Sequence, residues 1–81
     1  MGGVFILDYK SDVLDISYLG KNIKIERKKK AIKQNVLAKQ IGISNTYLSD
    51  IERQKTIPSL TTYIKICKVL NVDLEYILKK H

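Results

Sequence analysis

The chain has 81 residues, of which 44% are hydrophobic and 28% are charged, and it contains one proline. This length and composition predict a single folded domain rather than a disordered segment. The only cysteine, Cys67, excludes an internal disulfide and a metal site made of cysteines alone. The only histidine is the last residue, His81, and no carboxylates are paired for acid-base chemistry. We therefore expect no enzyme activity, no metal and no cofactor.

The positive charge is concentrated in the middle of the chain. The formal net charge is +7, and residues 21–55 contain ten basic and three acidic residues. Residues 1–20 contain one lysine and three aspartates. A high net charge alone is common among proteins that bind no nucleic acid. The placement of the charge on one segment is therefore the informative feature.

No apolar run approaches the roughly 18 residues needed to cross a bilayer, and the first residues lack the pattern of a secretory signal. We expect a cytoplasmic protein that makes no membrane contact. Residues 1–16 are expected to form an N-terminal arm of uncertain structure, and residues 17–81 the domain itself. The apolar run at residues 4–7 suits a short strand or a docking arm.

The first expected helix begins between Ser11 and Ser17, both of which can serve as N-caps. It ends in the basic run at residues 27–30, which has two equally weighted interpretations. In one, the positive side chains interact favourably with the negative C-terminal end of the helix dipole, and in the other they contact phosphates. Apolar residues at spacings of three and four predict one buried face, made of Ile16, Leu19 and Ile23.

Two short helices are expected next, over residues 34–41 and 45–53, with only two residues between Gly42 and the second helix start. Gly42 suits a left-handed C-cap, and Ser44 suits an N-cap.

After Pro58, Ser59 is expected to cap a fourth helix that ends at Leu70, with Asn71 in the left-handed conformation. Its predicted apolar stripe is Leu60, Tyr63, Ile64, Cys67 and Leu70. Asp73 is expected to cap a short fifth helix that carries Leu74, Ile77 and Leu78. The fold class is all-α.

Ala38, Gly42, Leu48 and Ile51 form the sharpest local pattern. The small Ala38 lets two helices approach closely, Gly42 makes the turn, and the two apolar residues attach the next helix to the core. These positions predict a helix-turn-helix, although a plain pair of core helices would satisfy the same spacing.

The outer face of the second helix of this pair favours DNA binding over plain packing. Its side chains can form hydrogen bonds with base edges in a major groove about 12 Å wide. The expected base-reading residues are Asn45, Thr46, Ser49 and Asp50. Positive side chains flank them, namely Lys33, Lys39, Arg53 and Lys55.

Residues 19–78 resemble the Cro and phage-repressor-like helix-turn-helix domains, also called the XRE family. The resemblance runs through LGKNIKIER at 19–27, QNVLAKQIGISNTYLSDIER at 34–53, Pro-Ser-Leu at 58–60 and KICKVLNVDLEYIL at 65–78. It implies a compact five-helix bundle, with the helix-turn-helix in helices 2 and 3. It also implies a homodimer on double-stranded DNA, with half-sites about 34 Å apart.

The resemblance also implies roles for individual residues. Asn45, Thr46 and Asp50 fall on the family's base-reading positions, Ser44 on its cap and backbone position, and Gln34 on a phosphate-contacting position at a helix N-terminus. The full set expected to contact the DNA backbone is Lys33, Gln34, Ser44, Tyr47, Arg53 and Lys55.

Two of these roles have alternatives. Asp50 can accept a hydrogen bond from cytosine, but we slightly favour a role in orienting Arg53 or Lys39. Tyr47 can contact the sugar-phosphate backbone or pack at the junction of the two helices.

Arg27 and Glu52 occupy positions that form a buried ion pair in related repressors, and two exposed charges are the alternative. Ala31 and Gln54 stand where the family often has glycine, so these turns either differ in geometry or carry about 1 kcal/mol of strain. Glu26 stands where an apolar residue is common, which predicts a slight rotation of the first helix.

The main alternative function is a protein-interaction module of the same fold, such as an antitoxin or a docking domain, with a protein partner held on the apolar segment at residues 4–7. Charge-driven DNA binding without sequence preference is a third possibility. The inventory of motifs favours a sequence-specific, repressor-type transcriptional regulator.

Overall fold

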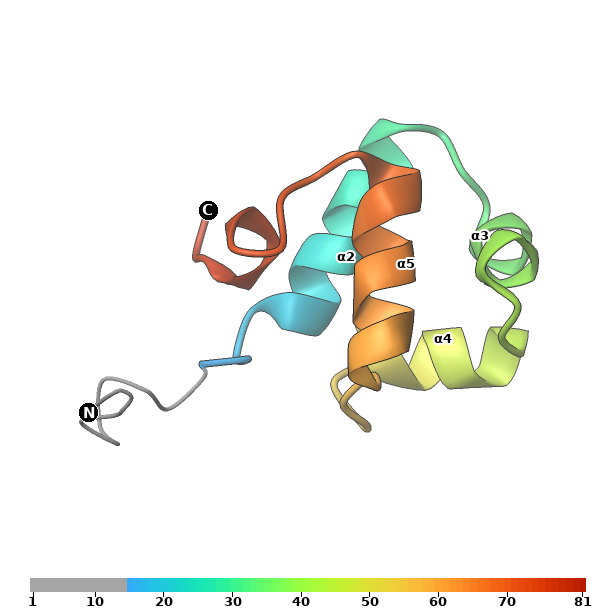
Figure 1. Ribbon diagram of the computed structural model, residues 1–81, viewed down its shortest axis with the longest axis horizontal. Helices are drawn as coiled ribbons and strands as arrows, with labels where there is room; N and C mark the ends of the chain where they lie inside the picture. Colours follow the sequence, from blue (N-terminus) through green and yellow to red (C-terminus); the bar gives the residue numbers. More distant parts are fainter. Residues whose placement is uncertain (1–14) are drawn as a thin grey trace.

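The computed structural model describes residues 15–81. The expected arm, including the apolar run at residues 4–7, lies outside them apart from its last two residues. Within the described part the chain is helical and contains no strand. Its elements are α2 (Leu19–Lys29), α3 (Gln34–Ile41), α4 (Asn45–Glu52), α5 (Leu60–Leu70) and the 3-10 helix η1 (Tyr76–Leu78) (Figure 1).

Helix α5 runs through the middle of the domain, with α2 beside it, α4 across its N-terminal end and α3 on the side away from η1 (Figure 1). Every element contributes at least one completely buried aliphatic side chain, and each such side chain stabilises the fold by about 1.5–3 kcal/mol. These are Ile23, Leu37, Leu48, Ile51, Ile66, Leu70 and Ile77. No helix of the described part is long and apolar enough to span a membrane.

The turns that bound α3, α4 and α5 have the predicted chemistry. Gly42 ends α3 in the left-handed region at φ 77°, and Asn71 ends α5 at φ 55°. The Ser44 hydroxyl accepts a hydrogen bond from the Tyr47 amide at 3.0 Å, and the Ser59 hydroxyl accepts one from the Thr62 amide at 3.2 Å. These caps satisfy amide groups that have no partner within the helix.

The predicted start of the first helix is wrong. Helix α2 begins at Leu19, and Tyr18, not Ser17, occupies its N-cap position without a side-chain cap. The Ser17 amide donates to the Asp15 carboxylate at 2.9 Å. The first turn of α2 is capped instead by a side chain distant in sequence. Gln54 accepts a hydrogen bond from the Gly20 amide, and its own amide nitrogen donates to the Ile16 carbonyl at 3.0 Å.

The C-terminal helix also differs from the prediction. η1 is a single 3-10 turn rather than a fifth α-helix, and Glu75, not Asp73, precedes it without a side-chain cap. Hydrogen bonds from α2 help to hold this segment in place. The Asn22 side chain of α2 donates to the carbonyls of Ile77 and Lys79 at 2.8 and 2.7 Å.

The predicted apolar stripe of α5 is only partly correct. Cys67 and Leu70 are buried, but Leu60 is 69% exposed, and the buried face instead includes Thr62 and Ile66. Leu60 is the first residue of α5. Burial raises the pKa of the Cys67 thiol to about 11, with a smaller contribution from the negative charge of Asp73.

Helix α2 is not rotated to bring Ile25 inward. Glu26 is 7% exposed and Ile25 is 38% exposed. Glu26 contacts the ammonium groups of Lys29 and Lys30 at 3.2 and 3.4 Å. Burial raises the pKa of the Glu26 carboxyl, but these two ammonium groups lower it by more, so the net shift is downward. The lysines thus let a carboxylate occupy an otherwise apolar position.

Substitution of Gln54 tests its role as a cap for α2. Gln54 has a φ of 62°, so it carries left-handed strain in addition to its two hydrogen bonds. Gln54→Ala keeps the strain and loses the bonds, and we expect it to lower the free energy of unfolding by about 1–3 kcal/mol. Gln54→Gly loses the same bonds but removes the strain, so it should be the more stable variant by about 1 kcal/mol.

Urea denaturation measures both effects. Ala31→Gly is the matched control, since Ala31 has a φ of 55°, and relief of its strain should raise stability slightly. A Gln54→Ala variant as stable as the parent chain would disprove the capping role.

Candidate nucleic-acid interface

Helices α3 and α4 form a rigid corner. The amide of Ile43 donates to the carbonyl of Ala38 at 3.0 Å across the left-handed Gly42. Ala38 is 2% exposed, which allows the close approach of the two helices. On α4, Leu48 and Ile51 are buried against the core. Their burial fixes which face of α4 points outward.

The outward face of α4 carries the predicted base-reading side chains. Asn45 and Thr46 are exposed in the first turn, and Ser49 and Asp50 are half-buried one turn later. This is the expected spatial grouping, with all four on one helix of eight residues. Such side chains offer donors and acceptors that match base edges.

Asp50 contacts a basic neighbour on the same face. Its carboxylate oxygen Oδ1 lies 3.1 Å from Nη2 of Arg53. Both side chains are partly exposed, so the pair contributes little to stability. The geometry agrees with the orienting role of Asp50, and Arg53, which directly follows the end of α4, is brought toward the same surface.

Tyr47 occupies the junction between helices. Its ring packs against the core cluster, and its hydroxyl accepts a hydrogen bond from the Ser59 amide at 3.3 Å. The hydroxyl is thus used within the domain to join α4 to the start of α5, which favours the packing interpretation over contact with the sugar-phosphate backbone.

Arg27 and Glu52 form a buried ion pair between α2 and the last residue of α4. Nε and Nη2 of Arg27 donate to the two carboxylate oxygens at 2.8 and 3.0 Å. Arg27 also donates from Nη1 to the carbonyl of Ile32 at 2.9 Å, in the turn before α3. The two residues are 7% and 6% exposed. One guanidinium group therefore joins three segments.

Gln34 extends this network to the surface. Its amide nitrogen donates to Oε1 of Glu52 at 3.1 Å. Because Glu52 only accepts hydrogen bonds, it fixes which end of the Gln34 amide points toward it. Gln34 is the first residue of α3, and no side chain caps this helix. The positive end of the helix dipole is therefore open beside an oriented amide, an arrangement suited to an anion.

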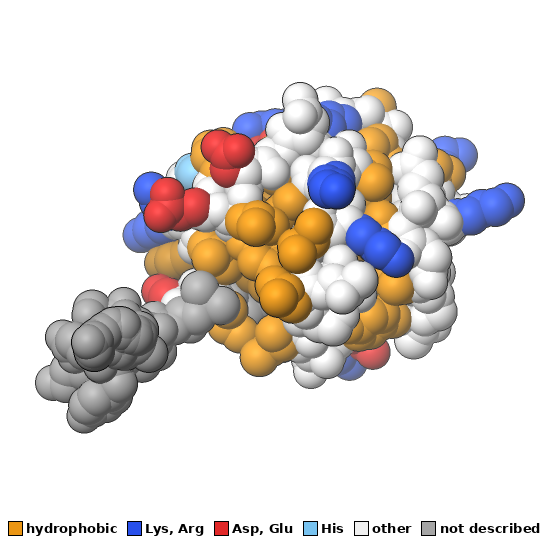
Figure 2. All heavy atoms as spheres, in the orientation of Figure 1, with side chains coloured by type: hydrophobic (Ala, Val, Ile, Leu, Met, Phe, Trp, Pro, Cys, Tyr) orange, Lys and Arg blue, Asp and Glu red, His pale blue; other side chains and the backbone are white. Residues whose placement is uncertain are grey.

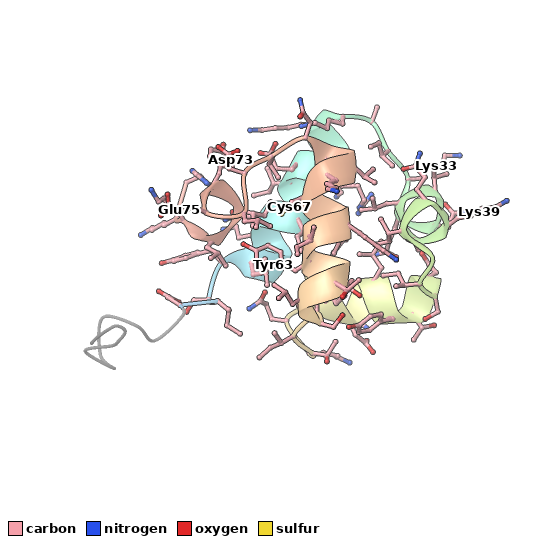
Figure 3. The ribbon with its side chains drawn as sticks, viewed as in Figure 1. Lys33, Lys39, Tyr63, Cys67, Asp73 and Glu75 are labelled. Atoms are coloured by element: carbon pink, nitrogen blue, oxygen red, sulfur yellow. The ribbon has the colours of Figure 1, made fainter. Side chains whose placement is uncertain are left out.

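The exposed lysines at the two ends of α3 lie away from the acidic residues that follow α5. Lys33 and Lys39 are on the side of the domain opposite Asp73 and Glu75 (Figure 3). Lys55, just after α4, is also exposed. Within the described residues no group of three or more possible metal ligands occurs. The surface of α3 and α4 is thus a polar face with positive flanks.

The sequence did not identify three polar side chains that form structural contacts elsewhere in the domain. They are Asn22, Gln54 as a cap, and Glu26 as a buried acid. A polar residue within an apolar helical stripe was the available signal for Asn22 and Glu26. The contacts of Gln54 cross more than thirty positions, and no local pattern indicates them.

A helix-turn-helix family model matches residues 23–77. The chain is 47% identical over 62 residues to the ImmF control region 10 kDa protein of Bacillus phage phi105. The aligned region covers 76% of this chain and 69% of that protein. The chain belongs to the helix-turn-helix family of phage repressors and related transcriptional regulators. It is also 33% identical to repressor protein C2 of Salmonella phage P22, of whose length it spans only 31%.

The solved structures that share this fold include two repressor–DNA complexes. The P22 c2 repressor in complex with a synthetic operator matches with a TM-score of 0.71 and 36% identity, over 75% of this chain and 92% of that chain. SinR of Bacillus subtilis in complex with DNA matches with a TM-score of 0.70 and 35% identity, over 75% and 98% of the two chains. The helix-turn-helix of this family corresponds to α3 and α4.

The Arg27–Glu52 pair is open to a stability test. Removal of one partner leaves the other charge buried, so Arg27→Met should lower the free energy of unfolding by about 3–5 kcal/mol. The double variant Arg27→Met/Glu52→Leu leaves no buried charge and should lose clearly less than the two single variants combined. Urea denaturation of the four chains forms a double-mutant cycle. Additive losses would contradict the coupling.

Proposed function

We propose that this chain binds double-stranded DNA in a sequence-specific manner, with α4 in the major groove, and acts as a repressor-type transcriptional regulator. The observation that carries the proposal is the exposed polar face of α4, held outward by Leu48 and Ile51. An inward apolar face fixes the orientation of the helix, and an outward polar face is free to contact base edges.

In this proposal the first turn of α4 supplies the strongest base contacts. Asn45 bonds N6 and N7 of an adenine, and Thr46 contributes its hydroxyl or its methyl group. Ser49 and Asp50 lie one turn further from the helix start and act as secondary readers, with Asp50 also orienting Arg53.

The remaining contacts are made to phosphates and position the domain without reading sequence. Gln34 donates to a phosphate from the amide that Glu52 orients, and the open N-terminus of α3 supports it. The other residues proposed to contact the backbone are Lys33, Ser44, Arg53 and Lys55. We assign Tyr47 to packing.

A protein partner is the second candidate, and one observation favours it. SinR is also found in a complex with the protein SinI, and that SinR chain matches this one with a TM-score of 0.71 and 35% identity. A docking or antitoxin domain of this fold would not need to select a DNA sequence. Selection from random duplexes therefore separates the two functions.

The proposed function predicts enrichment of a defined sequence when the purified chain is selected against random duplexes at physiological salt. Asn45→Ala should then weaken binding by about 1–3 kcal/mol only for duplexes that carry the preferred base at one position. Lys55→Ala should weaken binding to every duplex and reduce the salt dependence by about one ion.

Lys24→Ala is the matched control for Lys55→Ala, because Lys24 is exposed on α2, outside the proposed interface. It should leave affinity almost unchanged. Failure of any sequence to be enriched would refute the proposed function. Equal losses on all duplexes for Asn45→Ala would refute its reading role.

A further inference from the structure

One face of the domain is apolar and is left uncovered by the described residues. Leu60 at the start of α5 is 69% exposed, Ile64 one turn later is half-buried, and Leu74 in the following segment is 42% exposed. Figure 2 shows apolar side chains gathered between α5 and η1. We call this surface, made of Leu60, Ile64, Cys67, Lys68 and Leu74, the α5 face.

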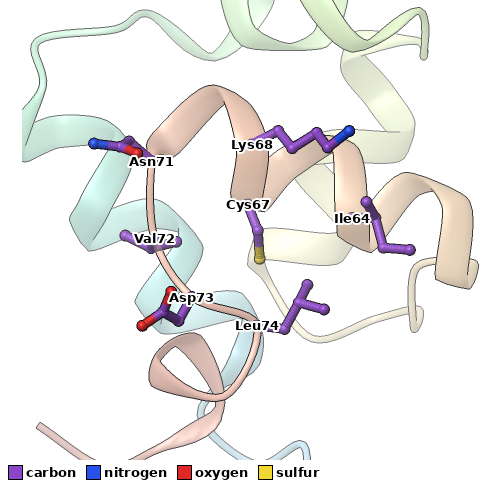
Figure 4. Close-up of a pocket in the computed structure, with 7 residues that line it drawn as sticks. All are labelled: Ile64, Cys67, Lys68, Asn71, Val72, Asp73 and Leu74. Carbon is purple, nitrogen blue, oxygen red and sulfur yellow. The ribbon is translucent and has the colours of Figure 1, made fainter.

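The α5 face is hollowed beside Cys67. A depression of about 390 Å³ lies between α5 and the residues that follow it, and it is lined by Ile64, Cys67, Lys68 and the segment 71–74. The sulfur of Cys67 points into the depression (Figure 4). Because one water molecule takes up only about 30 Å³ of liquid, the depression has room for side chains of a docked segment.

The chain enters the domain next to this face. The first turn of α2 lies against η1, because the Asn22 side chain donates to the carbonyls of Ile77 and Lys79. Leu74, which lines the depression, directly precedes the turn that leads into η1. In Figure 1 the described chain also begins on the side of α5 on which η1 lies. The start of the described part is therefore on the side of the domain that carries the α5 face.

The apolar run at residues 4–7 is within reach of the face. Residues 8–14 separate the run from the described part, and seven extended residues span up to about 23–25 Å. Helix α5 has 11 residues, so it is only about 16 Å long. Such a tether also holds the run near the face at an effective concentration on the order of millimolar, which favours it over a second copy in dilute solution.

The run and the residues after it match the chemistry of the face. The run is Val-Phe-Ile-Leu, and its four apolar side chains gain from removal from water. Residues 8–15 contain three aspartates and one lysine, a net charge of −2. Lys65 and Lys68 are exposed on α5, and neither forms any of the ion pairs found among residues 15–81. Asp8 directly follows the run, and Lys68 lines the depression.

We propose that the apolar run at residues 4–7 packs into the depression of the α5 face of its own chain, with Asp8 beside Lys68. The packed run covers Leu74 and the sulfur of Cys67. The outward face of α4 stays open, so the proposal does not rest on the proposed function. A protein partner that uses this run as a docking site has to displace it from the α5 face first.

Cys67 is a site-specific reporter of this packing, because it is the only cysteine of the chain and its sulfur points into the depression. Phe5→Cys and Ile6→Cys each add a second thiol within the run. Neighbouring side chains of an extended segment point to opposite sides, so one of the two variants should react faster. Treatment of the full chain with the thiol oxidant diamide should join its added thiol to Cys67 in an internal disulfide, followed by mass spectrometry and non-reducing gels.

Lys10→Cys is the matched control for the tether. Its added thiol has a shorter connection to the domain but lies outside the run. If the run is packed against Cys67, the internal disulfide of Lys10→Cys should form at least about tenfold more slowly than that of the faster run variant. Thermal unfolding of the reduced chains checks that every variant is folded.

Leu74→Lys tests the surface itself. In the faster run variant it places a charge in the apolar contact and should slow formation of the disulfide about tenfold. Val36→Lys is its matched control, because Val36 is also 42% exposed but lies on α3, on the side of the domain away from η1. Val36→Lys should leave the rate unchanged.

Exchange of charge tests the contact between Asp8 and Lys68. Asp8→Lys and Lys68→Glu should each slow formation of the disulfide about two- to fivefold, as expected for an exposed ion pair. The two changes together should restore the rate, because the opposite charges then stand in exchanged positions. Lys24→Glu makes the same charge change on α2 and should have no effect.

Rapid internal disulfides from the run, slowed by Leu74→Lys and not by Val36→Lys, would support the proposal. Equal rates for the run variants and Lys10→Cys would overturn it. Disulfide-linked dimers that form faster at higher protein concentration would place the run on a second copy and would also overturn it. Charge changes that do not compensate each other would refute the contact between Asp8 and Lys68.

Discussion

The buried pair of Arg27 and Glu52 is the constraint on which the arrangement of this domain depends. Its two short contacts join α2 to the end of α4, and a third bond from the same guanidinium holds the turn that leads into α3. A buried pair of this kind adds little net stability compared with apolar packing, but loss of one partner is costly. Its role is to fix the positions of α4 and of the turn before α3 relative to α2. The Gln34 side chain at the start of α3 donates to the same carboxylate, so the ion pair also orients this surface amide.

The contacts around α4 divide its residues between packing and recognition. Leu48 and Ile51 hold the helix to the core, and Tyr47 joins it to the start of α5. Glu52 is buried in the ion pair, and the polar side chains from Asn45 to Asp50 form the outer face.

Local chemistry made the helix ends between Gln34 and Asn71 predictable from the sequence. Gly42 and Asn71 tolerate the left-handed conformation, and Ser44 and Ser59 supply hydroxyls to free amides. The start of α2 was not predictable, because its cap is a glutamine from another part of the chain. The resemblance also suggested five helices, but the last segment forms one 3-10 turn held by Asn22.

The error at α5 has a physical explanation. Helical periodicity groups Leu60 and Ile64 with Cys67 and Leu70, since all lie on one apolar side. Periodicity does not indicate which part of a wide apolar side the rest of the domain covers. In the structure the core covers the part centred on Ile66 and Leu70 and leaves Leu60 exposed.

Mapping of DNA contacts on the isotope-labelled chain by NMR is the most direct test of the role assigned to α4. Titration with the selected duplex should shift amide signals of the first two turns of α4 and of the start of α3. Shifts confined to α5 or to the lysines of α2, with α4 unaffected, would contradict the assignment of α4 as the reading helix.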